Sequence, residues 1–131
     1  MAEDILKRLI YDEELEFEKL VPKVEKVVKV KKENGTPVIV CDEKKLSQKE
    51  KIMLYLIGKF FAKQLKLSET ESATNKEIAK WLKLKENVVS ARMSDLREEK
   101  LVEQVSKGEH KISTAKLDEF LDELLNKLGL Q

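Results

Sequence analysis

The chain has 131 residues, of which 41% are hydrophobic and 39% are charged, and its formal net charge is +1. Four glycines, two prolines and an aromatic content of 5% exclude collagen-like and low-complexity chains and argue against a turn-rich β-sandwich. A chain of this size suits one compact domain with an appendage. We therefore expect a mainly helical protein.

The sequence offers little for catalysis or metal binding. Cys41 is the one cysteine and His110 the one histidine, so neither an internal disulfide nor a His-rich zinc site can form within the chain. The sequence contains no glycine-rich phosphate loop and no Cys-x-x-Cys pair. We expect no enzymatic activity, no metal and no cofactor.

Composition also bears on the compartment. A lone cysteine favours a reducing environment. No apolar run approaches the roughly 20 residues that cross a bilayer, and no charged and then apolar leader precedes a cleavage site. We expect a cytoplasmic protein without a membrane anchor. Lysine outnumbers arginine 23 to 3, and lysine and glutamate dominate, which is the bias of hyperthermophile proteins.

The charges are unevenly spread along the chain. Residues 3–18 carry seven acidic residues against two basic ones, whereas residues 23–66 carry twelve lysines against five acidic residues. Residues 74–114 are closer to balance, with nine basic and seven acidic residues. Because the total is close to neutral, only local patches can serve a polyanion.

The first 45 residues are predicted to form an extension of helix and β-hairpin. The spacing of Ile5, Leu6, Leu9 and Ile10 indicates one or two short amphipathic helices over residues 3–21, which Pro22 should end.

A hairpin is expected next, over residues 27–41, because Asn34-Gly35 separates two β-branched runs. A two-residue turn would pair Glu33 with Thr36. The predicted inner face then consists of Val28, Val30, Ile39 and Cys41, with Val30 opposite Ile39 and Val28 opposite Cys41. The outer face consists of Lys29, Lys31, Val38 and Val40.

The most hydrophobic segment is a helix predicted over 48–66, which the capping box Ser47–Glu50 opens. It is apolar over most of its circumference, so it should be buried on more than one side. Gly58 and Ala62 leave a notch for a close neighbour. Either the N-terminal segment or a partner subunit covers the second side. Together with a leucine face over residues 115–128, this helix predicts a homodimer.

The remaining elements follow in quick succession. A second capping box, Thr74–Glu77, opens another helix after the polar connection 67–73. A third helix covers about 86–99, with Val89, Met93 and Leu96 inward. The next segments are predicted as a strand, a tight turn, a return strand and a final helix: 101–105, 106–109, 110–113 and 114–129.

The stretch Thr74–Ser113 resembles a winged helix-turn-helix DNA-binding domain and is similar in style to small archaeal regulator-like proteins. The segments that carry the resemblance are Glu77–Leu82, Val89–Leu96, Glu98–Val102 and, for the wing, Val105–Ile112. The expected fold class is mainly α with small β. A winged helix-turn-helix domain with a C-terminal helix would span residues 46–131, after the helix and β-hairpin extension over residues 1–45.

The resemblance implies binding to double-stranded DNA by a transcriptional regulator. Its third helix enters the major groove, and its wing, residues 105–112, lies on the backbone. The candidates for base contacts are Asn87, Ser90, Ala91 and Ser94. The candidates for phosphate contacts are Lys85, Arg92, Arg97, Lys100, Lys107 and Lys111.

A protein–protein interaction module in a larger complex is the alternative, because winged helices also serve that purpose. Ala91 stands where many relatives place a base-reading cation, and Asp95 and Glu98 would repel phosphates. A continuous positive stripe across the candidate phosphate contacts would favour DNA. An exposed apolar patch around the hairpin would favour a protein partner.

Three single residues receive structural interpretations. Cys41 is expected to be a small half-buried hydrophobe, and Trp81 to flank the core. His110 lies in the predicted wing, where its side chain should be solvated, with a phosphate contact as the alternative.

Overall fold

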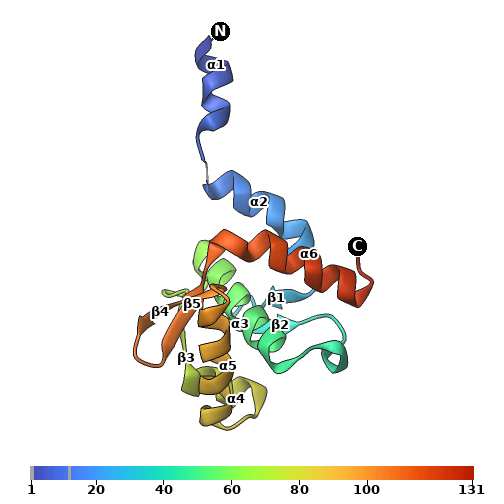
Figure 1. Ribbon diagram of the computed structural model, residues 1–131, viewed down its shortest axis with the longest axis vertical. Coiled ribbons are helices and arrows are strands. Elements are labelled where there is room, and N and C mark those ends of the chain that lie inside the picture. The colour runs from blue at the N-terminus through green and yellow to red at the C-terminus, as the bar shows by residue number, and fades with distance from the viewer. Residues whose placement is uncertain (1, 12) are drawn as a thin grey trace.

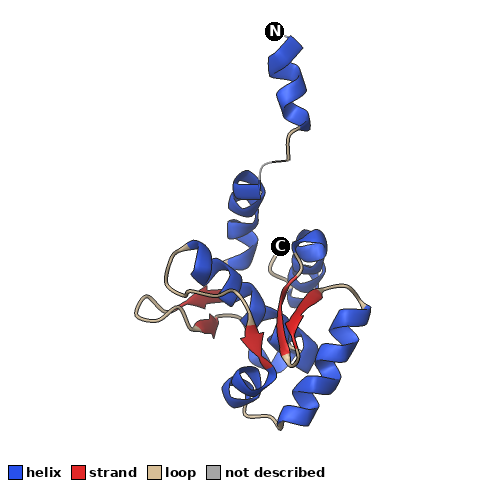
Figure 2. Ribbon diagram, turned by 90° about the vertical axis from the view of Figure 1, so that its left-hand side faces the viewer, coloured by secondary structure: helices blue, strands red, loops and turns tan. Residues whose placement is uncertain are grey.

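The computed structural model describes residues 2–11 and 13–131, and shows a mainly helical chain with two small antiparallel sheets (Figures 1 and 2). The α-helices are α1 (Ala2–Leu6), α2 (Glu13–Val24), α3 (Gln48–Gln64), α4 (Asn75–Leu82), α5 (Glu86–Glu98) and α6 (Leu117–Leu128). Short 3-10 helices cover Lys7–Leu9, Glu43–Lys45 and Thr114–Lys116. Among the described residues, no helix combines the length and apolarity needed to cross a membrane.

Helix α3 lies at the centre of the molecule. The predicted capping box is formed: Glu50 N donates to Ser47 Oγ at 3.1 Å and Ser47 N donates to Glu50 Oε1 at 2.8 Å. Its buried residues are Ile52, Met53, Leu54, Tyr55, Leu56, Ile57, Gly58, Phe60 and Ala62. The first hairpin packs on α3, and so do α4, α5 and the second sheet. The expectation that this helix is buried on more than one side is confirmed.

The first sheet is the predicted hairpin, made of β1 (Val28–Val30) and β2 (Pro37–Ile39), but its predicted register is wrong. Val28 pairs with Ile39 and Val30 with Pro37, a shift of two residues. Lys31 N donates to Thr36 O, so four residues form the loop, and Gly35 alone has positive φ (+73°). Asn34 instead accepts from Thr36 N through its side chain at 3.0 Å, so the expected type I′ turn does not form.

The predicted faces of the hairpin survive this shift because side chains alternate with a period of two. Val28 is 2% exposed, and Val30, Ile39 and Cys41 are partly buried, the last as expected. The outer-face residues Lys29, Lys31, Val38 and Val40 are exposed.

The notch on α3 receives the hairpin backbone. A Cβ added to Gly58 would lie 2.6 Å from Pro37 Cβ, and one added to Gly35 would lie 3.0 Å from Ala62 Cβ. Both distances are far inside ordinary van der Waals contact. Small residues at 58 and 62 therefore set how closely the hairpin approaches the central helix.

Helices α2 and α6 pack together above the core (Figure 1). Pro22, which the sequence predicts to end the helix, lies in the last turn of α2. Pro22 has no N–H to donate to the carbonyl of Glu18. Glu18 is exposed, so water can donate a hydrogen bond to this carbonyl instead. Lys23 Nζ lies 2.5 Å from Asp118 and 2.8 Å from Asp122, and these carboxylates raise the Lys23 pKa.

The leucine face of α6 is buried within the chain, at Leu117, Leu121, Leu124, Leu125 and Leu128. The second side of α3 is likewise covered within the chain, by residues 17–41. The two apolar faces from which the sequence predicts a homodimer are thus buried within a single chain. A dimer has to use residues other than these buried ones.

The second sheet has the order β3-β5-β4 and consists of β3 (Ala73–Thr74), β4 (Val102–Ser106) and β5 (Glu109–Ile112). The sequence predicts β4 and β5 within one residue but misses β3, which falls in the expected polar connection. Two residues are too few for a pattern, and β3 exists because Ala73 pairs with His110.

Candidate nucleic-acid interface

Helix α5 separates a buried face from an exposed one. Val89, Met93 and Leu96 are at most 1% exposed, as their spacing predicts. A turn of three residues, 83–85, joins α4 to α5, and Lys83 takes the left-handed conformation there (φ 58°). The helix begins at Glu86, as the sequence predicts, so Asn87 lies in its first turn.

The predicted base-contact residues share the outer face of α5. Asn87, Ser90 and Ala91 are exposed, and Ser94 is half-buried. These side chains are short and carry no charge. A helix with such a face allows its backbone to come close to another surface and offers an amide and hydroxyls for hydrogen bonds.

Three of the predicted phosphate contacts are exposed lysines. Lys85 stands at the N-cap of α5, Lys100 just beyond its end and Lys107 in the turn of the second hairpin. They make no ion pair within the described part of the chain. A helix of 13 residues is about 20 Å long, so Lys85 and Lys100 bracket the outer face of α5.

Arg92 and Lys111 are engaged with carboxylates of the same chain. Arg92 Nε lies 3.1 Å from Asp95 Oδ2, and Lys111 Nζ lies 3.5 Å from Glu71 and 3.7 Å from Glu103. Their charges are partly neutralised. The continuous positive stripe that would favour DNA binding is therefore interrupted at these two positions.

His110 is the clearest error of the sequence analysis, because its side chain is 0% exposed rather than solvated. Arg97 Nη1 lies 2.8 Å from His110 Nε2. A guanidinium only donates, so this ring nitrogen accepts and the imidazole is neutral. Burial, followed by the charge of Arg97, lowers the His110 pKa. Arg97 as a whole residue is exposed, although its guanidinium group contacts His110 in the second sheet.

The turn of the second hairpin is fastened to the start of α4. Asn75 N donates to Gly108 O at 2.8 Å, and Ser106 Oγ donates to Glu109 Oε1 at 3.1 Å. Ser72 also donates to Glu109, and the two hydroxyls lower the pKa of that carboxyl. This fixes Lys107 beside the beginning of α4.

Sequence reasoning missed the lysines of α4 and its turn. Lys76, Lys80 and Lys83 are exposed, and Lys76 follows Asn75, whose backbone is bonded to the turn that holds Lys107. The spacing of Lys76 and Lys80, four residues apart within a capped helix, was the available signal. Lys83 adds positive charge close to Lys85, and Lys76 adds it beside Lys107.

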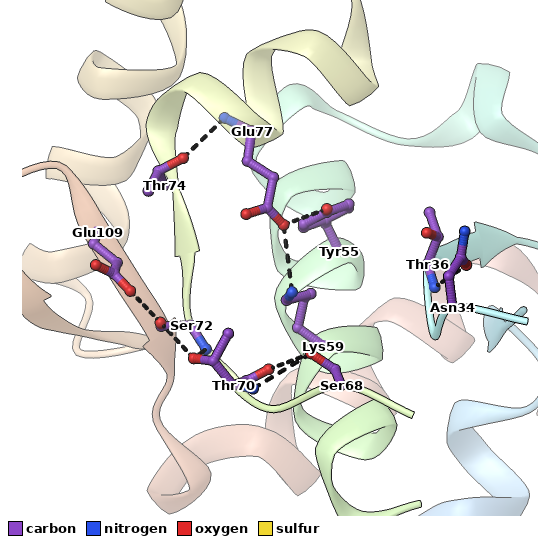
Figure 3. A network of polar contacts seen from close by, with 10 residues as sticks. All are labelled: Asn34, Thr36, Tyr55, Lys59, Ser68, Thr70, Ser72, Thr74, Glu77 and Glu109. Carbon is purple, nitrogen blue, oxygen red and sulfur yellow. Dashed lines mark hydrogen bonds and ion pairs between the residues drawn. The ribbon is translucent and has the colours of Figure 1, made fainter. Parts of the chain in front are cut away.

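A polar network fixes α4 against α3 (Figure 3). Tyr55 Oη donates to Glu77 Oε2 at 2.5 Å, and Lys59 Nζ lies 3.5 Å from the same oxygen. Burial and this carboxylate raise the Tyr55 pKa. The Trp81 ring packs on Tyr55 with centroids 4.6 Å apart, which agrees with the expected place at the edge of the core. The two helices before α5 are thereby held in one arrangement.

The described residues contain no group of three or more His, Cys, Asp or Glu side chains suited to a metal ion. No protein-family model, no curated protein and no solved structure matches the chain.

Proposed function

We propose that the protein is a winged-helix protein that binds double-stranded DNA and acts as a transcriptional regulator, without catalysis or cofactor. The observation that carries the proposal is the outer face of α5, where the short, uncharged side chains of Asn87, Ser90, Ala91 and Ser94 lie together. The exposed lysines Lys85 and Lys100 stand at the two ends of the helix, and Glu98 is the acidic residue on this face. The order α3, β3, α4, α5, β4, β5, with a three-residue turn between α4 and α5, supports it.

In this proposal α5 enters the major groove and the hairpin β4–β5 lies along the backbone. Asn87 can make paired hydrogen bonds to adenine, and Ser90 and Ser94 can donate to base edges. Ala91 allows close approach. Lys85, Lys100 and Lys107, with the lysines of α4, neutralise phosphates. Arg92, Arg97 and Lys111 contribute after release from their present partners.

The test is binding to random-sequence duplex DNA at two salt concentrations, measured by fluorescence anisotropy. We expect Ala91→Glu to weaken binding at least tenfold, about 1.4 kcal/mol, because the new carboxylate faces phosphates. Thermal stability should stay within about 0.5 kcal/mol, since Ala91 is exposed. Ala115→Glu is the matched control, because it adds the same charge at an exposed alanine beside α2 and α6.

Lys107→Ala should weaken binding to all sequences alike and reduce the salt dependence by about one charge. Equal DNA affinity in Ala91→Glu and the parent contradicts the proposed role of α5. Absence of parental binding at low salt contradicts DNA binding altogether.

One observation favours protein docking as a second candidate. Val38 and Val40 on the outer face of the hairpin are 37% and 45% exposed, and Val38 shares a shallow pocket with Trp81. Such a patch suits an apolar partner. The two candidates differ in the face they use, so Val40→Asp should leave DNA affinity unchanged if the first is right.

A further inference from the structure

Residues 2–11 form an arm that extends from the body (Figures 1 and 2). Five of its side chains are large, apolar and 59–81% exposed: Ile5, Leu6, Leu9, Ile10 and Tyr11. Scattered apolar residues are normal on a surface, but five within ten residues form a continuous patch. This arm has no covering element in the described part of the chain.

An apolar groove of about 640 Å³ lies between α2, β1 and α3. Its floor and walls include Phe17, Val21, Val28, Phe61 and Leu65, with the backbone of Gly58. Val21 and Leu65 are 44% and 61% exposed, which places them among the most exposed apolar side chains outside the arm. The groove is therefore open and unfilled by its own chain.

The arm and the groove also match in charge. Glu18 of α2, Glu25 directly after α2 and Lys29 of β1 all line the groove. The arm carries Glu3 and Asp4 followed by Lys7 and Arg8. An arm in the groove can thus set its basic residues against Glu18 and Glu25 and its acidic residues against Lys29.

We propose that the arm of one copy docks in the groove of a second copy and receives that copy's arm in return, forming an arm-exchanged homodimer. Each arm points away from the body that carries it, so its own groove is not the surface it meets (Figure 1). The exchange brings two arm–groove contacts per dimer.

This proposal does not rest on DNA binding. No residue that lines the groove belongs to α4, α5, β4 or β5. An exchanged dimer therefore leaves the outer face of α5 free in both copies.

Sedimentation velocity from 1 to 100 µM tests the exchange without DNA. We expect a dimer for the parent and at least a tenfold weaker association for Leu9→Asp in the arm and for Leu65→Asp in the groove. Both side chains are more than 60% exposed, so each variant should fold, as circular dichroism will show. Val40→Asp, an equally polar change at an exposed valine outside arm and groove, should dimerise like the parent.

Mixing the two variants gives the decisive measurement. The Leu65→Asp copy keeps an intact arm and the Leu9→Asp copy keeps an intact groove, so the mixture should form a heterodimer through one contact. A parent that is monomeric at 100 µM overturns the proposal. So does a parental dimer that survives both substitutions, since another surface then holds it.

Arm exchange must also be distinguished from docking of the arm in the groove of its own chain. In a Cys41→Ser background, Leu9→Cys in one chain and Leu65→Cys in another should give a disulfide-linked dimer on mixing. Cross-linking only when both cysteines lie in the same chain, with a monomeric product, overturns exchange in favour of folding back.

Discussion

The pair formed by Arg97 and His110 is the most consequential polar contact at the residue scale. It joins the exposed end of α5 to a fully buried position in the sheet, and its geometry requires a neutral imidazole. Nδ1 then carries the proton, and it has no hydrogen-bond partner in the described structure. Protonation of Nε2 would turn its acceptor into a donor that faces the guanidinium.

This contact makes the free energy of unfolding depend on pH. The folded-state pKa of His110 is lowered, so below the unfolded pKa of about 6.5 the unfolded chain binds more protons than the folded one. Stability should therefore fall as the pH drops from 7.5 to 5.5, by at most about 1.4 kcal/mol per pH unit.

Urea unfolding at the two pH values measures this loss. His110→Gln keeps an acceptor for Arg97 and cannot titrate, so its unfolding free energy should change little over the same interval. An unchanged pH slope in His110→Gln would assign the dependence to another group.

At the element scale, sequence reasoning succeeded where local rules act alone. The capping box of α3, the Thr74 cap of α4, the inward spacing of Val89 and Met93 and the closing Gly129 need only neighbours within a turn of helix. The second predicted capping box is only half formed, because the Glu77 carboxylate accepts from Tyr55 instead of from the Thr74 backbone. Burial of Val28 and exposure of Lys29 were also predictable, because strand alternation decides them.

Tertiary contacts decided the features that were missed. The hairpin register depends on Gly35 and Pro37 packing against α3, the strand β3 depends on pairing with β5, and the burial of His110 depends on Arg97. The candidate site divides in the same way. The outer face of α5 and the Arg92–Asp95 pair follow from helical spacing, whereas the ion pair of Lys111 with Glu71 involves a partner that only the folded chain brings near.

The contact between α3 and the hairpin predicts that Gly58→Ala lowers the free energy of unfolding, the opposite of what this substitution usually does in a helix. Gly58→Ala would stabilise an exposed helix by roughly 0.5–1 kcal/mol. Here the new Cβ would lie 2.6 Å from Pro37 Cβ, so we expect a loss of about 1–3 kcal/mol instead.

A double-mutant cycle isolates this contact. Pro37→Gly removes the opposing atoms, so Gly58→Ala should cost less in the Pro37→Gly background than in the parent. Chemical denaturation gives each of the four free energies. Equal costs in both backgrounds would show that the hairpin does not press on α3.

At the scale of the whole molecule, α3 belongs to both halves of the chain. The segment that the sequence sets apart as residues 1–45 supplies Leu20, Val24, Val27 and Val28 to the same buried cluster that holds Ile78, Val89 and Met93. The described part of the extension that follows the arm thus shares its core with α4 and α5. A shared core predicts cooperative unfolding.

Trp81, the one tryptophan, reports on α4, while far-ultraviolet circular dichroism reports on every helix. Val27→Ala and Val89→Ala remove the same atoms from two positions that are each 0% exposed, one in either half. Each should cost about 2 kcal/mol. In the Leu9→Asp background, where arm exchange does not contribute, we expect both variants to move the fluorescence and circular dichroism transitions together. If Val27→Ala shifted the circular dichroism transition but left the Trp81 transition in place, residues 13–45 would unfold as a separate unit and the boundary near residue 45 would be a domain boundary in the thermodynamic sense.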